Sequence, residues 1–374
     1  MKIFNTLSKT EEEFISIKPK QISIYVCGIT PYDTTHLGHA FTYINFDVLI
    51  RYLKSQGNEV NYTQNVTDIN DRDNDILERA KQQNISWEEL SKFWTDKFLQ
   101  DMKSLNWIMP TNYLYASKNI PFMIKLIQKL IDNGFAYAVN GSVYLDVIKK
   151  KDYGKLSGLD QQQMLKIARD FEEDVDNPDK KNKLDITLWR AAQPDQPTHI
   201  PFFNSPFSKG RPGWHLECSA MSISSLGEQI DIHGGGTDLI YPHHEAEIAQ
   251  SEGATGKIPF AKFWIHTAQV AYQGEKMSKS KGNLVMVSDL LKKYSANAIR
   301  WLLLSHHYRE PWEFKEEDLE NAQKNVDSLK DNLQDGDTKK FSQIMDDDLN
   351  TPKVLELLLQ AKNKTIFEIL GFKI

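Results

Sequence analysis

The segment QISIYVCG, residues 21–28, decides the fold class, because a run of β-branched and apolar residues that ends in glycine is typical of a buried strand. A polar loop follows it, and residues 40–56 then have the pattern of a helix. We expect a second strand at 60–64 and helices at 87–105 and 120–134. This alternation predicts an α/β fold with a parallel sheet and with active residues at the carboxyl ends of its strands.

The middle of the chain breaks this alternation. A short strand pattern at 142–147 and a polar stretch at 170–183, which predicts an exposed loop, indicate an insertion. Strand patterns return at 229–233 and 264–271, so we expect the sheet to be split in sequence. From about Glu316 the tail is helical in pattern.

The composition is that of an ordinary globular protein. A chain of 374 residues is long enough for two or three domains, and its 40% hydrophobic and 26% charged residues are typical of soluble proteins. The sequence has no apolar run near the roughly 18 residues that cross a bilayer, and its start, MKIFNTLSKTEEEF, lacks the layout of a signal peptide. We therefore expect a cytoplasmic protein with no membrane segment.

Cysteine content and charge narrow the possible chemistry. The chain has two cysteines, Cys27 and Cys218, and a disulfide between them is not expected in a reducing cytosol. They could instead be buried thiols, a nucleophile or metal ligands. The net charge of −6 does not favour general binding of nucleic acid, which depends on Lys and Arg. A nucleic-acid partner would need a local basic surface, and lysines cluster within 149–151, 180–183 and 292–293.

The motif CGITPYDTTHLGH, residues 27–39, lies at the predicted turn from strand to helix. His36 and His39 flank Leu37 and Gly38, so two imidazoles can point at one ligand. A glycine between them lets an adenine ring approach the backbone closely.

A second motif, GEKMSKSKGN at residues 274–283, places Lys276 and Lys279 in a loop rich in Gly and Ser. Two lysines on a mobile loop can close over a triphosphate and neutralise charge while the α-phosphate is attacked. The pair HLGH and KMSKS resembles the two signature motifs of class I aminoacyl-tRNA synthetases. The resemblance implies a Rossmann-type catalytic domain that binds ATP and forms an aminoacyl adenylate.

Two further segments, GRPGWHLECSAM at 210–221 and DIHGGGTDLIYPHHEAEIAQSEG at 231–253, suggest a metal site. His243 and Glu247 are four residues apart, so they project from one face of a helix that starts near Pro242. With Cys27 and Cys218 they form a set of donors suited to one zinc ion.

These segments, with NVTDIND at 65–71, resemble cysteinyl-tRNA synthetase from Tyr25 to about Thr351, which is most of the chain. The zinc ligands of that family match Cys27, Cys218, His243 and Glu247. The resemblance also implies three groups of binding residues: Gly28, Thr67 and Trp214 in the amino-acid pocket, Gly234, Gly235, Gly236 and Asp238 with Gly38 and Lys279 near ATP, and His233 near the reactive carboxylate. It implies L-cysteine, ATP with Mg²⁺ and tRNA-Cys as partners, and a monomer.

Zinc suits a cysteine substrate for a physical reason. Cysteine and serine are near-isosteres, which an ordinary pocket separates by roughly 1 to 3 kcal/mol. A thiolate is a soft ligand that zinc binds far better than an alcohol. We expect the cysteine carboxylate to attack the α-phosphate of ATP in line, with His36, His39, Lys276 and Lys279 as the catalytic residues and no covalent protein nucleophile.

The acceptor of the activated cysteine has two candidates. Ligases of the mycothiol pathway, which join cysteine to glucosaminyl-inositol, share this core, and HHYREPWEF at 306–314 leans towards them. Glu247 and MDDDLNTPKVLELL at 345–358 favour tRNA instead. From Glu316 to the end, 8 Lys stand against 13 Asp and Glu, so the tail does not resemble a phosphate-binding surface. A third hypothesis is an inactive relative that binds RNA or protein through a structural zinc.

The resulting prediction is an α/β chain with a Rossmann-type class I catalytic domain, an inserted connective domain and a C-terminal helical region. The expected boundaries are 1–115 and 201–272 for the two halves of the catalytic domain, 116–200 for the insertion, 273–325 for the KMSKS loop and stem-contact region, and 326–374 for a truncated helical domain.

Overall fold

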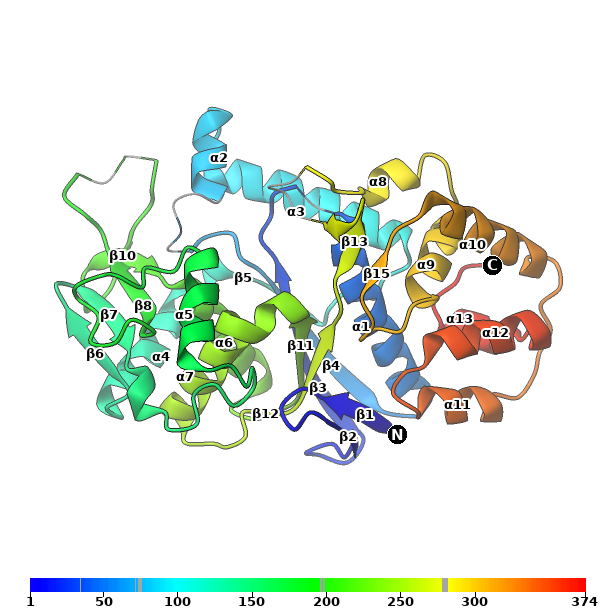
Figure 1. The fold of residues 1–374 in the computed structure, drawn as a ribbon, viewed down its shortest axis with the longest axis horizontal. Coiled ribbons are helices and arrows are strands. Elements are labelled where there is room, and N and C mark those ends of the chain that lie inside the picture. The colour runs from blue at the N-terminus through cyan, green and yellow to red at the C-terminus, as the bar shows by residue number, and fades with distance from the viewer. Residues whose placement is uncertain (34, 71, 73–75, 196, 198, 278–281) are drawn as a thin grey trace.

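A computed structural model describes residues 1–33, 35–70, 72, 76–195, 197, 199–277 and 282–374. Its centre is a sheet of five strands in the order β12-β11-β3-β4-β5, and every neighbouring pair is parallel (Figure 1). In that order the strands are Ala261–Thr267, Ile230–Gly236, Gln21–Ile29, Glu59–Val66 and Asn112–Tyr115. The predicted parallel α/β fold is therefore confirmed, and strands from both ends of the insertion meet in one sheet, as expected.

The two faces of β3 pack against different layers. Ile22, Ile24 and Val26 belong to the apolar core that contains α1 (Leu37–Ser55), while Tyr25 and Cys27 belong to the core that contains α6 (Trp214–Leu226) and α7 (Glu245–Thr255). Successive side chains of a strand alternate between faces, so this division follows from the sequence of β3. As a result the Cys27 thiol lies on the side of α6 and α7.

The insertion forms its own antiparallel sheet, in the order β6-β7-β8-β10-β9, drawn in green in Figure 1. In that order its strands are Ala136–Val139, Ser142–Leu145, Ile186–Ala191, Lys209–Pro212 and Phe203–Asn204. Gly210 pairs with Ala191, so this sheet continues past residue 200, where we expected the insertion to end. The polar stretch after Asp170 has neither helix nor strand, but it is not exposed throughout, because Val175 is buried.

The expected strand at 264–271 is two strands. β12 ends at Thr267, and the chain then leaves the central sheet to form β13 (Val270–Tyr272), which pairs with β14 (Glu275–Lys276) and β15 (Trp312–Glu313). The KMSKS loop begins at β14. A separate hairpin, β1 (Lys2–Asn5) and β2 (Thr10–Glu13), lies at the N-terminus.

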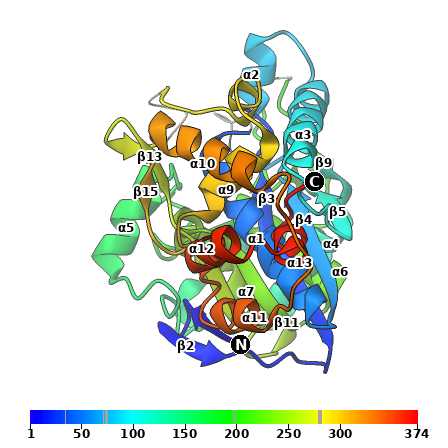
Figure 2. The ribbon, with the colours of Figure 1, turned by 90° about the vertical axis from the view of Figure 1, so that its right-hand side faces the viewer.

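Helices surround these sheets. Besides α1, α6 and α7 they are α2 (Ile76–Gln82), α3 (Trp87–Ser104), α4 (Ile120–Asp132), α5 (Gln161–Asp170), α8 (Val287–Leu290), α9 (Ala296–Leu304), α10 (Glu316–Leu329), α11 (Lys339–Met345), α12 (Thr351–Ala361) and α13 (Lys364–Ile369). Figure 2 shows α9 to α13 packed together beside α1. In the described part of the chain, no helix has the length and apolar character that a membrane span requires.

A buried ion pair attaches the helical tail to α1, the helix that packs on the central sheet. Arg300 on α9 pairs with Asp47 on α1, and both side chains are almost wholly excluded from solvent. The Arg300 guanidinium also donates to the carbonyls of Leu105 and Leu370, so its donors are satisfied on three elements. A buried charge with several partners holds its neighbours in one arrangement, because losing any partner would leave it uncompensated.

Candidate functional site

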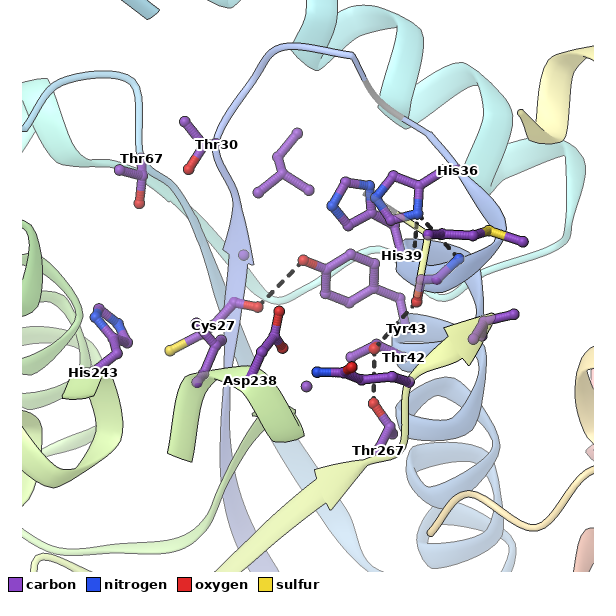
Figure 3. Close-up of a pocket in the computed structure, with 18 of the residues that line it drawn as sticks. Cys27, Thr30, His36, His39, Thr42, Tyr43, Thr67, Asp238, His243 and Thr267 are labelled. Atoms are coloured by element: carbon purple, nitrogen blue, oxygen red, sulfur yellow. Dashed lines mark hydrogen bonds between the residues drawn. The ribbon is translucent and has the colours of Figure 1, made fainter. Parts of the chain in front are cut away.

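A cavity of about 330 Å³ opens at the carboxyl ends of four parallel strands. Cys27 and Thr30 line it from the end of β3, Thr67 follows β4, Asp238 follows β11, and Thr267 ends β12 (Figure 3). This is the edge where a parallel sheet is expected to place its active residues. Figure 3 shows Cys27 and His243 at one end of the cavity and His36 and His39 at the other.

Four buried donors meet at the first end. Cys27, Cys218, His243 and Glu247 each offer a ligand atom, and these atoms all lie within 4.8 Å of one another. Oε1 of Glu247 is 3.4 Å from Sγ of Cys27 and 3.3 Å from Nε2 of His243. Ligands about 2.0 to 2.3 Å from a tetrahedral zinc ion are roughly 3.3 to 3.8 Å apart, so the donor set and its spacing fit zinc.

The local structure explains how His243 and Glu247 come to face each other. The chain kinks at Tyr241, whose backbone is extended (φ −137°, ψ 134°), and His243 lies between this kink and α7, which begins at Glu245. His243 and Glu247 meet across this start of the helix, as the four-residue spacing predicts.

Burial controls the protonation of these donors. It lowers the pKa of His243 well below its ordinary value, so the imidazole is neutral, the form that binds a metal. Burial also raises the pKa of Cys27, and the neighbouring Cys218 and Glu247 raise it further. Without a cation, Cys218 and Glu247 therefore oppose ionisation of the Cys27 thiol, whereas a divalent ion would stabilise its thiolate.

His233, expected near the substrate carboxylate, lies directly behind Glu247. Its side chain is fully buried, its ring stacks on Trp264, and its Nε2 lies 2.9 Å from Oε2 of Glu247. It is therefore placed to orient Glu247 from behind. With His244, Cys27 and Glu247 it also forms a second set of four donors within the same 4.8 Å limit, and sequence reasoning missed the part of His244.

The other end of the cavity is built around the start of α1. His36 is the N-cap of this helix, and its Nδ1 accepts hydrogen bonds from the backbone N–H groups of Gly38 and His39 at 3.1 and 3.4 Å. The rings of His36 and His39 stack with centroids 3.7 Å apart, and both residues line the cavity. The two imidazoles thus contact each other, an arrangement that the motif alone did not indicate.

The predicted glycines have distinct reasons to lack a side chain. A Cβ on Gly28 would lie 1.6 Å from the backbone oxygen of Asn65, because β3 and β4 approach closely there. A Cβ on Gly38 would lie 2.9 Å from the His36 ring. Gly234 and Gly235 would meet Phe46 and His244, and of the three consecutive glycines only Gly236 lines the cavity. Packing by itself therefore gives each of these residues a reason to be glycine.

Lys276 and Asp238, both predicted near ATP, meet at the rim. Nζ of Lys276 is 3.2 Å from Oδ2 of Asp238, and both side chains are exposed to solvent by more than two fifths. Lys279 lies outside the described residues, so its predicted role remains a prediction.

Thr67 and Trp214 line the cavity beside the four donors, as the resemblance implies. Trp214 stacks on His243 with centroids 4.8 Å apart. Oγ1 of Thr67 accepts a hydrogen bond from Nδ2 of Asn65, whose Oδ1 in turn accepts one from the Gly28 backbone. These contacts connect the ends of β3 and β4 with the wall of the pocket.

Sequence reasoning missed several residues of the cavity. Tyr43 donates to the backbone oxygen of Cys27, and Thr42 and Thr267 share a hydrogen bond of 2.7 Å (Figure 3). Tyr43 follows His39 by one helical turn, so helical periodicity could have identified it. No local signal points to Thr267 or to Phe171, which reaches the cavity from the insertion.

Comparisons with known proteins agree with this geometry. The family described as tRNA synthetases class I (C) catalytic domain matches residues 13–324. Cysteine–tRNA ligases of Dehalococcoides mccartyi and Legionella pneumophila are 46% and 44% identical to this chain, and each alignment covers 97% of it and 80% of the relative. A cysteine–tRNA ligase of Thermococcus onnurineus is 42% identical over 97% of this chain and 79% of its own length.

Solved structures share the fold at lower identity. The methionyl-tRNA synthetase of Mycobacterium tuberculosis, in complex with methionyl-adenylate, matches with a TM-score of 0.66 and 14% identity, over 91% of this chain and 82% of that one. At this level of identity the likeness concerns the fold alone.

Proposed function

Because this chain belongs to the class I (C) tRNA synthetase family, that of the cysteine–tRNA ligases, we propose that it activates L-cysteine with ATP and transfers it to tRNA-Cys. The observation that carries this proposal is the cavity itself, with four zinc-binding donors at one end and the HLGH and KMSKS motifs at the other. A cysteine whose thiol lies at the metal end of this cavity would direct its carboxylate towards the nucleotide end.

Cys27, Cys218, His243 and Glu247 would hold one zinc ion per chain, and a bound zinc supplies preference for the substrate thiolate over an alcohol. The chain's own side chains provide the rest of the pocket. Trp214 covers His243, and Thr67 presents a hydroxyl at the same end. Phe171 and Trp214 restrict the space available to water.

At the other end, His36, His39 and Gly38 would border the adenosine, and Mg²⁺ would accompany ATP. Asp238 keeps Lys276 at the rim of the cavity. When a triphosphate arrives, Lys276 can exchange this carboxylate for phosphate oxygens and neutralise charge as the α-phosphate is attacked. Lys279 would act from the same loop.

The proposed acceptor is the 3′ end of tRNA-Cys, since the relatives described above are all named for this reaction. The expected division into catalytic halves, insertion, stem-contact region and helical domain is part of the proposal, with the insertion extended to Pro212. The proposal places the protein in the cytoplasm, where tRNA and ATP are available, and as a monomer.

An acceptor assay tests this function directly. Zinc-loaded protein should catalyse ATP–pyrophosphate exchange that depends on cysteine and not on serine, and should charge tRNA-Cys. Parallel reactions contain glucosaminyl-inositol in place of tRNA. Transfer to the amino sugar alone would replace tRNA as the acceptor, while a lack of exchange would support a binding protein with a structural metal.

A further inference from the structure

A chain of polar contacts runs from the insertion to the back of the zinc-binding cluster. Nε2 of His215 lies 3.0 Å from Oε1 of Glu173, and Nδ1 of His215 lies 2.9 Å from Nδ1 of His243. His215 and His243 are each only 2% exposed. None of the sequence motifs indicated that these two rings would meet.

Arg72 holds the insertion end of this chain in place. Its guanidinium donates to Oε1 of Glu173 at 2.9 Å and to the backbone oxygen of Phe171 at 2.7 Å. The same guanidinium lies 4.1 Å over the ring of Trp214, which stacks in turn on His243. Glu173 is thereby fixed beside His215, although the two residues are 42 positions apart in the sequence.

The direction of the hydrogen bonds follows from the donors and acceptors available. A carboxylate only accepts, so His215 must place its proton on Nε2 to donate to Glu173. Glu173 accepts from the Arg72 guanidinium as well, so both of its partners are donors. A His215 that donates from Nε2 and accepts at Nδ1 is the tautomer that leaves Nδ1 of His243 to act as the donor.

His243 must then donate its own proton from Nδ1 to Nδ1 of His215. A neutral imidazole has one N–H group, so Nε2 of His243 keeps its lone pair. Nε2 is the nitrogen that lies 3.3 Å from Oε1 of Glu247, on the side where the four donors meet. The chain of contacts thus selects the tautomer of His243 that can bind a metal.

We propose that Glu173 is a positioning residue, which acts through His215 to hold His243 in the tautomer and orientation that bind zinc, with Arg72 fixing Glu173. This inference rests on the proposed function, since it takes His243 as a zinc ligand. It assigns to the insertion a part in selecting the substrate thiol, because Glu173 lies within that insertion and Phe171, two residues before it, lines the cavity.

The test compares two substitutions of Glu173 in the full chain, with zinc affinity measured by competition with a chelator. Glu173→Ala removes the acceptor for His215, and we expect zinc binding to weaken roughly 10- to 100-fold, as is usual when a partner of a metal ligand is lost. Glu173→Gln keeps an acceptor oxygen and should recover most of the affinity. Glu172→Ala, an exposed neighbour, is the control and should bind zinc like the wild type.

Kinetics of cysteine-dependent ATP–pyrophosphate exchange separate positioning from a general structural effect. For Glu173→Ala we expect a higher KM for cysteine and an unchanged KM for ATP. Unchanged zinc affinity would overturn the inference, and so would equal losses in Glu173→Ala and Glu173→Gln that extend to the KM for ATP. If the wild-type protein itself neither binds zinc nor activates cysteine, the proposed function fails, whatever the variants do.

Discussion

The two ends of the cavity differ in how firmly the protein holds its side chains. At the thiol end, Cys27, Cys218, His243 and Glu247 are almost completely buried, and His233 and His215 support them from behind. At the phosphate end, the side chain of Lys276 pairs with Asp238, and both side chains remain exposed to solvent. A metal site needs donors fixed in advance, whereas lysines that follow a reacting phosphate must be able to move. Under the proposed function, selection of cysteine and formation of the adenylate would rely on separate parts of the fold.

Removing a donor from the rigid end should have the largest effect. We expect Cys218→Ser to lose zinc and to weaken cysteine binding by more than roughly 100-fold. This exceeds the effect of losing a hydrogen-bond partner of a metal ligand, because here the ligand itself is lost. The KM for ATP should stay near the wild-type value, because the nucleotide end is separate. Metal analysis and exchange kinetics measure both effects, and full zinc occupancy in the variant would remove Cys218 from the site.

A change at the exposed, phosphate end should affect rate more than binding. Lys276→Ala should lower kcat for exchange on the order of 100-fold, the usual effect of removing one group that stabilises transition-state charge. Zinc content and the KM for cysteine should be unchanged. Lys324→Ala, an exposed lysine on α10, is the matched control. A rise in the KM for cysteine as large as the fall in kcat would contradict the separation of the two ends.

Two glycines test the difference in rigidity itself. A Cβ on Gly28 would meet the Asn65 backbone at 1.6 Å, so Gly28→Ala must displace a strand and should destabilise the protein by about 1 to 3 kcal/mol. A Cβ on Gly236 would meet the end of the Asp238 side chain at 2.5 Å, which can turn away, so Gly236→Ala should cost less than about 0.5 kcal/mol. Urea unfolding compares them, and equal losses would refute the distinction.

A small effect that depends on pH is expected where the insertion attaches to α7, the helix that carries Glu247. Burial alone would raise the pKa of Asp152, but Lys150 and Lys155 lower it to about 2, below its ordinary value. Lys150 and Lys155 also pair with Glu252 on α7. A lowered folded-state pKa contributes stability above about pH 4 that is lost as the pH falls towards 2.

Asp152→Asn should therefore destabilise the protein by roughly 0.2 to 1 kcal/mol at pH 6.5, since the carboxylate is largely exposed. The difference from the wild type should shrink as the pH approaches 2. Urea unfolding across this range measures it. A difference that is constant with pH would mean that the charge of Asp152 does not stabilise the attachment.

Residues that share a motif or a helical face were accessible from the sequence. The four-residue spacing of His243 and Glu247 indicated that they would meet, and the strand from Gln21 to Gly28 placed Cys27 near a carboxyl end. The resemblance to cysteinyl-tRNA synthetase then implied that Cys218, which is 191 positions from Cys27, belongs to the same set of donors. Local periodicity alone does not predict that these residues come together in space, because it carries no information about which helices pack on which face of the sheet.

Contacts between distant segments were not accessible in the same way. Glu173 meets His215, His233 meets Glu247, and Thr267 meets Thr42 because sheet pairing and helix packing bring their elements together. The expected single strand at 264–271 was wrong for the same reason. Apolar residues continue through this segment, but the strand that ends at Thr267 belongs to the central sheet and the strand that starts at Val270 belongs to another. The sequence pattern does not show this change of sheet.

The sequence by itself determined the alternation of strands and helices, the identity of the chemical groups and the spacing of those on one element, since these depend on backbone geometry and side-chain chemistry. The tertiary structure alone decided that donors from β3, α6 and the start of α7 converge on one point, and that a carboxylate from the insertion supports them. Convergence depends on the relative placement of packed layers, which is a property of the whole chain, so no local stretch of residues encodes it.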